Sequence, residues 1–283
     1  MAFEPGFKVT DLGAIGEADL DPRDVSRLVK KVFNTQIFHS GFVHCDPHPA
    51  NVLIRRHPRM AGRPQMVLVD HGLYKRIDDH FRITYARLWR ALFMADLAEI
   101  KAACGVMGIT DMYPLLAAML TARPFDEILE RSDPSRYGTT GASPSGPAGD
   151  SAMLRGYARK YAGEIVAMLD AVPRQMLLLF KTNDCLRHID RSLGRPHADA
   201  PAAAGGEAAR AVLRHELAGI AGGDVVGAAR RWTGYAVVIF RVWAYGVAMH
   251  LGGSYRRYLR FVRQRGLRLY RRRLEPGAGA AVR

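Results

Sequence analysis

Two short polar segments constrain the fold of this chain more than any other feature. The first covers residues 44–51 and reads His-Cys-Asp-Pro-His-Pro-Ala-Asn, and the second is Asp-His-Gly at residues 70–72. Two apolar runs of strand length, 52–54 and 66–69, lie between them, separated by a stretch that contains two Pro and one Gly. This pattern predicts a β-hairpin whose two outer ends hold the polar segments close together.

The spacing of the polar side chains points to phosphoryl transfer. With His44, Asp46 and Asn51 have the H-x-D-x-x-x-x-N spacing of a phosphotransferase catalytic loop, and Asp70 follows where the metal-binding aspartate of such enzymes lies. Asp46 would accept or orient an attacking hydroxyl group. Asn51 and Asp70 would supply the hard oxygen ligands that Mg²⁺ prefers. We therefore predict Asp46 as the catalytic residue and Asn51 and Asp70 as the metal ligands.

The histidines leave a second interpretation open. His48 and His71, with His44 and Asp46, could form a zinc or manganese cluster of a metal-dependent hydrolase. They lack the helical spacing of known zinc pairs, and Asn51 is a poor ligand for a transition metal. We expect His44 to support the backbone of the loop rather than to take part in chemistry.

The rest of the chain is predicted to be helical. Asp21 and Pro22 are typical of a helix start, and Gly41 can end that helix. Further helices are predicted at 83–93, 97–107, 112–120, 156–169 and 173–187, the last of them buried. Flexible segments are predicted at 132–150 and 194–206. The expected fold class is mainly α with a small β-hairpin.

Positive charge gathers at the C-terminal end. Of the net charge of +14, residues 230–283 carry +12, from thirteen Arg and one acid. A basic amphipathic helix is predicted around residues 255–273, which either lies on an anionic membrane surface or packs on the protein with its Arg in water. Residues 232–251 are apolar at transmembrane length, but the central Arg241 favours a buried or interfacial helix over a span. No nucleic-acid-binding module is recognised.

Cysteine usage and the N-terminus exclude some classes. Cys45, Cys104 and Cys185 are far apart and form no Cys-x-x-Cys pair, so neither a disulfide framework nor a thiolate zinc site is predicted. The first residues resemble neither a secretory signal nor an Arg-rich transit peptide.

Four stretches resemble the UbiB-like (aarF-domain) atypical protein kinases. Residues 44–51 resemble their H-x-D-P-H-P-G-N loop, and 70–74 resemble their D-[FH]-G segment in the form with His. Residues 3–9 resemble the end of the hinge between two kinase lobes, and 173–184 resemble part of the helical lobe. The resemblance covers about residues 1–195 and implies a protein-kinase-like C-lobe.

The resemblance also implies roles and boundaries. Asp46 matches the catalytic-loop aspartate, Asn51 and Asp70 match the metal ligands, and the cofactors would be Mg²⁺ and ATP. The resemblance implies a hinge remnant (1–8) and the C-lobe (9–195). Charge and composition, rather than the resemblance, predict a basic helical extension (207–274) and a disordered tail (275–283). Members of the family are linked to quinone or lipid metabolism and to mitochondrial or plastid membranes.

Two departures from the family pattern bear on activity. Ala50 stands where the family usually has Gly, and it would be strained if that position requires a positive φ. Nothing before the hinge supplies the lysine, its glutamate partner or the nucleotide loop of an N-lobe. The ATP site is therefore expected to be incomplete, and the chain, as a fragment of a two-lobed protein, to be inactive or feeble. The alternative is a non-enzymatic membrane scaffold or regulatory pseudokinase.

Overall fold

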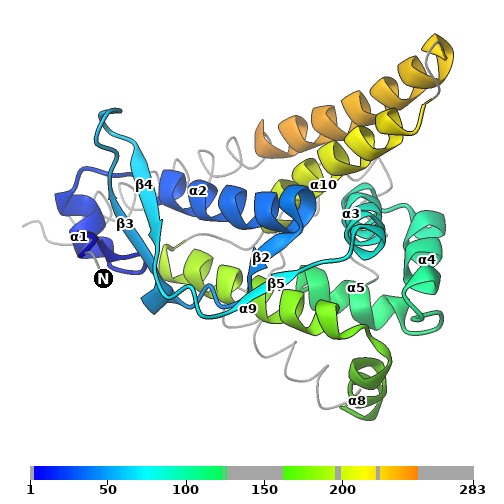
Figure 1. Cartoon of the computed structure of the whole chain (residues 1–283), viewed down its shortest axis with the longest axis horizontal. Helices are drawn as coiled ribbons and strands as arrows, with labels where there is room; N and C mark the ends of the chain where they lie inside the picture. The colour runs from blue at the N-terminus through cyan, green and yellow to red at the C-terminus, as the bar shows by residue number, and fades with distance from the viewer. Residues whose placement is uncertain (1–2, 124, 126–161, 195–198, 221–223, 248–283) are drawn as a thin grey trace, which may run out of the picture. The chain divides into compact units, whose positions relative to one another are not determined.

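The computed structural model describes residues 3–123, 125, 162–194, 199–220 and 224–247 (Figure 1). The predicted loop at 132–150, the predicted basic helix at 255–273 and the predicted tail lie outside these residues. The chain comprises two compact units, residues 1–242 and residues 243–283. Of the second unit only 243–247 are described, and they are helical.

The predicted hairpin is confirmed. Strands β3 (Val52–Arg56) and β4 (Pro64–Leu68) pair antiparallel, with Val52 opposite Leu68 and Arg56 opposite Pro64. The pairing extends two residues further into the predicted turn on each side. Strand β1 (Phe7–Lys8) joins the outer edge of β3, so the sheet has the order β1-β3-β4.

A second antiparallel pair was not predicted. Strand β2 (Phe42–His44) runs into the first polar segment, and β5 (Tyr74–Arg76) leaves the second. His44 lies opposite Tyr74 in this pair. The two polar segments are therefore joined by strand pairing on both sides, by β3–β4 between them and by β2–β5 outside them.

The helix before the first polar segment begins as predicted. After the short α1 (Leu12–Glu17), helix α2 (Pro22–Thr35) has Pro22 in its first turn, and the Asp21 carboxylate accepts the N–H of Arg23 at 2.7 Å. Its last turn, η1 (Gln36–Ser40), widens into a π-helix that the sequence did not reveal. Gly41, at a φ of 63°, ends it in the left-handed region, as a C-terminal glycine does.

Helices α3 (Asp79–Met94), α4 (Leu97–Val106) and α5 (Tyr113–Thr121) match the prediction, with α3 beginning four residues earlier than expected. Asp78 caps α3 by accepting the N–H of Phe81 at 3.0 Å. They are followed among the described residues by α8 (Ala162–Ala171) and α9 (Arg174–Ser192). The mainly α fold with a small hairpin is thus confirmed.

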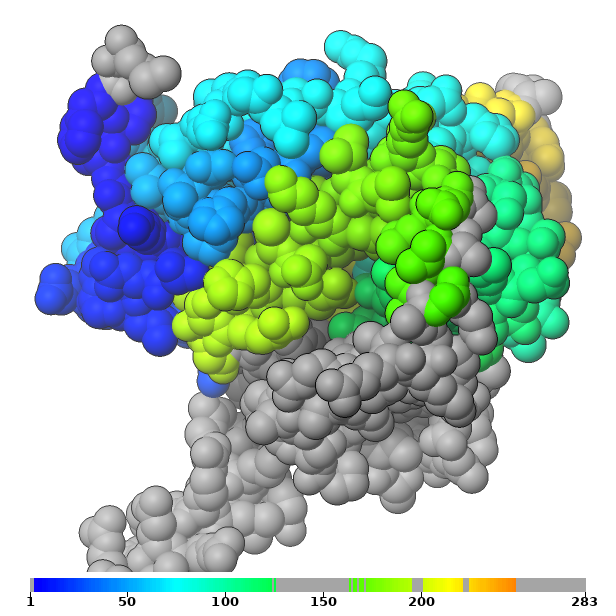
Figure 2. Space-filling model, turned by 90° about the horizontal axis from the view of Figure 1, so that it is seen from below, coloured from blue at the N-terminus to red at the C-terminus, as the bar shows by residue number. Residues whose placement is uncertain are grey.

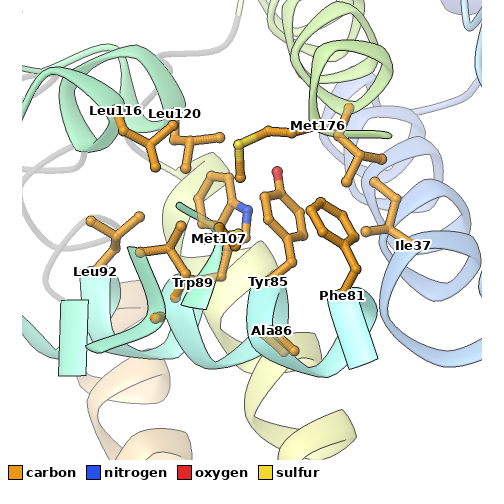
Figure 3. Packing of buried hydrophobic residues seen from close by; sticks show 14 of the residues in the cluster. Ile37, Phe81, Tyr85, Ala86, Trp89, Leu92, Met107, Leu116, Leu120 and Met176 are labelled. Carbon is orange, nitrogen blue, oxygen red and sulfur yellow. The ribbon is translucent and has the colours of Figure 1, made fainter. Parts of the chain in front are cut away.

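Aromatic side chains of α3 organise the larger core. Figure 3 shows Phe81, Tyr85 and Trp89 in a row on α3, with Met176 of α9 and Leu116 of α5 beyond them. The ring of Tyr85 is fully buried, and this burial raises its pKa to about 12. Its hydroxyl group accepts a hydrogen bond from Asn183 Nδ2 of α9 at 3.1 Å, which gives the buried polar group a partner.

Helix α9 is amphipathic rather than buried all round. Met176 and Leu179 are buried in the core, but Leu177 is 37% exposed. In Figure 2, α9 lies across one face of the protein, between the blue and cyan N-terminal segments and the green α4 and α5. The prediction of a wholly buried helix was wrong because its apolar run lies at the edge of the core.

The prediction of a flexible linker at 194–206 was wrong from residue 199 onward. Helix α10 (Asp199–Ala218) begins there and packs along α3 and α2. Its alanines are strong helix formers, and Ala204 and Ala208 join the core. Gly205 is buried against Phe93: a Cβ at this position would lie 2.7 Å from the Phe93 Cβ. Glycine is therefore used for close helix packing, not for flexibility.

Residues 225–242 form a further helix, and apolar side chains cover its outer face. Val225, Trp232, Val237 and Phe240 are each more than half exposed, whereas Val238 on the opposite side is buried. Among the residues that the structure describes, no helix has both the length and the hydrophobicity needed to cross a bilayer. Over its described residues this helix is therefore not buried all round.

Candidate functional site

His44 joins the two polar segments from the end of β2. Its buried ring accepts the N–H of Asp46 at Nδ1, at 3.3 Å, so the neutral ring carries its hydrogen on Nε2. That Nε2 lies 2.9 Å from the backbone oxygen of Asp70, to which it donates. The backbone N–H of His44 is held by Gln36 Oε1 of the π-helical turn, at 2.9 Å. These bonds agree with the expected structural role of His44.

Asn51 makes the second connection between the segments. It ends a short 3₁₀ turn, η2 (Pro49–Asn51), and its Nδ2 donates to the backbone oxygen of Asp46 at 3.2 Å. Its own backbone oxygen accepts the N–H of Val69, the residue before Asp70, at 2.9 Å. The side-chain nitrogen is used to hold the loop, so the predicted metal-ligand role of Asn51 would use its amide oxygen.

Asp70 has an unusual backbone conformation. It is exposed, and its φ of 60° lies in the left-handed region, which few residues other than glycine adopt. Gly72 N donates to Asp70 Oδ1 at 3.3 Å, and a Cβ on Gly72 would lie 3.1 Å from that oxygen. Asp70 itself therefore has the positive φ of this turn, and Gly72 provides room for its carboxylate.

The strain considered for Ala50 does not arise. Ala50 is not among the described residues with a positive φ, and it lies inside the 3₁₀ turn. Its N–H donates to His48 Nδ1 at 3.2 Å, so His48 caps this turn. Alanine fits here without cost because the turn uses ordinary right-handed backbone.

Together these bonds form a ring through the three predicted site residues. Asp46 is bonded to His44 and to Asn51, His44 is bonded to Asp70, and Asn51 is bonded to the residue next to Asp70. The structure thus brings the three residues to one place. Two acids and an amide make a set of hard oxygens that fits Mg²⁺. Their individual roles stay predictions.

The hydrolase interpretation has no assembled ligand set. No group of three or more His, Cys, Asp or Glu suited to a metal ion occurs among the described residues. Both ring nitrogens of His44 are used within the loop, and His71 Nδ1 lies 2.8 Å from the Tyr74 hydroxyl group. His44 and His48 therefore bond to the backbone of this region, and His71 contacts the Tyr74 side chain.

Lys181 is a site residue that the sequence did not assign. From α9 its Nζ lies 2.9 Å from Asp46 Oδ1, and this hydrogen-bonded ion pair raises the pKa of the lysine. The available signal was a lysine immediately after the apolar run 176–180, within the stretch 173–184 that resembles the helical lobe. Nothing in that signal pairs it with a residue far earlier in the chain.

Other polar residues of α9 fix the helix in place. Gln175 Oε1 accepts the N–H of Asp78 at 3.2 Å, at the start of α3. Asp190, 2% exposed in its side chain, accepts Ser26 Oγ at 2.6 Å and pairs with Lys30 Nζ at 3.1 Å, both on α2. Helix α9 is therefore anchored to α2 and α3 on either side of Lys181.

These features define a class of protein. A short hairpin that brings a catalytic-type loop and an Asp-His-Gly segment together, followed by a helical body, is the arrangement of a protein-kinase-like C-lobe. Comparison with known proteins gives the family: residues 1–104 match the ABC1 atypical kinase-like domain, and this part of the chain belongs to that family.

Named relatives agree with this assignment. The chain is 40% identical over 194 residues to AarF domain-containing protein kinase 1 of Mus musculus. This alignment covers 69% of the present chain and 35% of the mouse protein. It is 31% identical over 194 residues to a probable serine/threonine-protein kinase, abkD, of Dictyostelium discoideum, covering 69% of the chain and 26% of that protein. The chain thus spans between about a quarter and about a third of the length of these relatives. No solved structure matches it.

Proposed function

We propose that this chain is the C-lobe part of an atypical kinase or ATPase that uses Mg²⁺ and ATP. The observation that carries the proposal is the ring of hydrogen bonds that joins Asp46, Asn51 and Asp70. Kinase-type catalysis depends on positioning and on charge neutralisation, and these bonds fix the backbone from which the three side chains project.

Each residue has a definite part in this proposal. Asp46 accepts the proton of the attacking hydroxyl group or water while the oxygen of that attacking group approaches phosphorus. Asn51 and Asp70 hold the metal through oxygen atoms. His44 keeps the loop and the Asp70 backbone in register through Nε2. When bound, the magnesium nucleotide would supply the phosphoryl group to be transferred, and ADP would be the leaving group.

We further propose that the 283-residue chain on its own turns over little or no nucleotide. The residues that hold the α- and β-phosphates in two-lobed kinases have no counterpart in its sequence, and positioning provides much of the rate enhancement. Binding, rather than turnover, is therefore the first property to measure.

The test is magnesium-dependent nucleotide binding by the wild-type chain and by Asp70→Asn. Asparagine tolerates the left-handed backbone of Asp70, so this variant removes the charge with little effect on the turn. We expect about tenfold weaker binding, which is ~1.4 kcal/mol. Asp111→Asn, an exposed acid between α4 and α5, is the matched control. Equal affinity in wild type and Asp70→Asn would remove the metal role of Asp70.

A second candidate function, which does not compete with the first, is contact with an anionic membrane. The exposed apolar face of residues 225–242 favours it, with Trp232 53% and Phe240 64% exposed and with Arg230 and Arg231 nearby in the chain. Apolar side chains enter the interface while arginines meet acidic headgroups. Such a position fits the lipid or quinone metabolism that the family resemblance implies.

Sedimentation with vesicles tests the membrane contact. We expect the chain to sediment with vesicles that contain phosphatidylserine, less so with pure phosphatidylcholine, and less at high salt because ions screen the charges. A Trp232→Ser, Phe240→Ser variant should lose most of the binding. Binding that ignores lipid charge, salt and this variant would refute the proposal.

A further inference from the structure

Lys181 occupies a position whose chemistry the proposed function leaves unexplained. Its ammonium group lies 2.9 Å from Asp46 Oδ1, yet its side chain is 52% exposed and that of Asp46 is 33% exposed. The pair is open to solvent, so holding the fold together does not account for it: exposed ion pairs contribute about 0–1 kcal/mol. The buried pair between Lys30 of α2 and Asp190 of α9 shows what a structural ion pair looks like in this protein.

The helix places Lys181 and does so firmly. Gln175 is bonded to the start of α3 before it, and Asn183 is bonded to the buried Tyr85 hydroxyl group two residues after it. Met176 and Leu179 are buried on the core side of the same turns. The backbone of α9 at Lys181 is therefore fixed, and the ammonium group of the lysine reaches Asp46 from this fixed position.

The ammonium group has more donors than this contact uses. It carries three N–H groups, and the contact with Asp46 Oδ1 takes one. Two N–H donors and a full positive charge therefore remain beside Asp46, the carboxylate that we propose accepts the proton of the attacking group. The γ-phosphoryl group must approach this same place for transfer, and lysine binds phosphate as a point charge.

We propose that Lys181 binds the γ-phosphate of the nucleotide and keeps the transferring phosphoryl group beside Asp46. This inference deepens the proposed function and depends on it. In this proposal Lys181 of α9 contacts the γ-phosphate, which ATP has and ADP lacks. A lysine that merely oriented Asp46 would not distinguish the two nucleotides.

The comparison of ATP with ADP tests this. The dissociation constants of the magnesium complexes of both are measured by NMR titration of the 283-residue chain, a method that extends to millimolar affinities. For Lys181→Gln we expect ATP binding to weaken about tenfold, equivalent to ~1.4 kcal/mol, and ADP binding to change less than twofold. Lys181→Arg keeps the charge and should retain most of the ATP preference.

The controls separate the possible failures. Lys101→Gln, an exposed lysine on α4 in contact with the Tyr113 ring, should leave both affinities unchanged. If Lys181→Gln lowers the affinities for ATP and for ADP equally, or lowers neither affinity, the γ-phosphate role is wrong while the proposed function stands. If the wild-type chain binds neither nucleotide with dependence on Mg²⁺, the proposed function and this inference both fall.

Discussion

At the scale of single residues, the backbone of Asp70 is the least expected feature. Its left-handed conformation turns the chain immediately after the strand end, while His44 holds its carbonyl group. Left-handed residues other than glycine cost free energy and persist where the surroundings impose them, often at functional sites. The ring of hydrogen bonds around Asp70 is such a surrounding.

This conformation makes a prediction about stability. Asp70→Gly should be more stable than Asp70→Ala by about 1 kcal/mol, because glycine adopts a positive φ freely and alanine does not. Urea denaturation followed by circular dichroism measures the difference. Two variants of equal stability would show that Asp70 does not hold this backbone conformation in solution.

The sequence predicted the site residues unevenly, and the reason is sequence distance. Asn51 and Asp70 lie on neighbouring ends of one hairpin, so their proximity follows from strand and turn patterns alone. Lys181 meets Asp46 only through the packing of α9 on α2 and α3, which no local pattern encodes. The left-handed conformation of Asp70 was not predicted, because few residues other than glycine adopt a positive φ.

At the scale of elements, α9 and α10 show where pattern reading fails. The apolar run in α9 predicted burial, but its exposed side carries Lys181, the residue that contacts the site. The Ala, Pro and Gly of the α10 segment predicted a linker, but the segment is helical and its Gly205 allows the helix to approach α3 closely. The hairpin and α2 were predicted well because caps and turns are local signals.

The close approach of α10 to α3 makes a second prediction. Gly205→Ala should destabilise the protein by about 1–3 kcal/mol, because the new methyl group would overlap Phe93. Gly206→Ala is the matched control: its nearest neighbour would be Val242 at 3.7 Å, an ordinary contact, and alanine favours the helix. Thermal denaturation compares the two variants. Equal effects would argue against the tight contact at Phe93.

At the scale of the whole molecule, a His–Glu pair links the N-terminal helices to α10. His39 Nε2, in the π-helical turn, lies 2.9 Å from Glu207 Oε2, and Arg210 Nη1 lies 3.1 Å from Oε1. The hydrogen bond to His39 lowers the pKa of Glu207, against the effect of burial. Folding therefore favours the ionised carboxylate.

The pH dependence of stability tests this link. A carboxyl group with a lowered pKa in the folded state contributes stability above its ordinary pKa of 4.5, and this contribution is lost as the pH falls through the folded value. Glu207→Gln should therefore be less stable than wild type at pH 6, with the difference shrinking below pH 4.5. Glu17→Gln, an exposed acid on α1, should differ little from wild type at any pH. A difference for Glu207→Gln that ignores pH would contradict the ionised pair.

The claim on which the proposals depend is that Asn51 and Asp70 hold one metal ion beside Asp46. Mn²⁺ accepts the oxygen ligands of Mg²⁺ and broadens the NMR signals of nearby amide groups. With Mn²⁺ and ATP added to the 283-residue chain, we predict broadening that centres on the amides of Asn51 and of residues 70–72 and that disappears in Asp70→Asn. Broadening that leaves these amides untouched, or that is the same in the variant, would contradict the account.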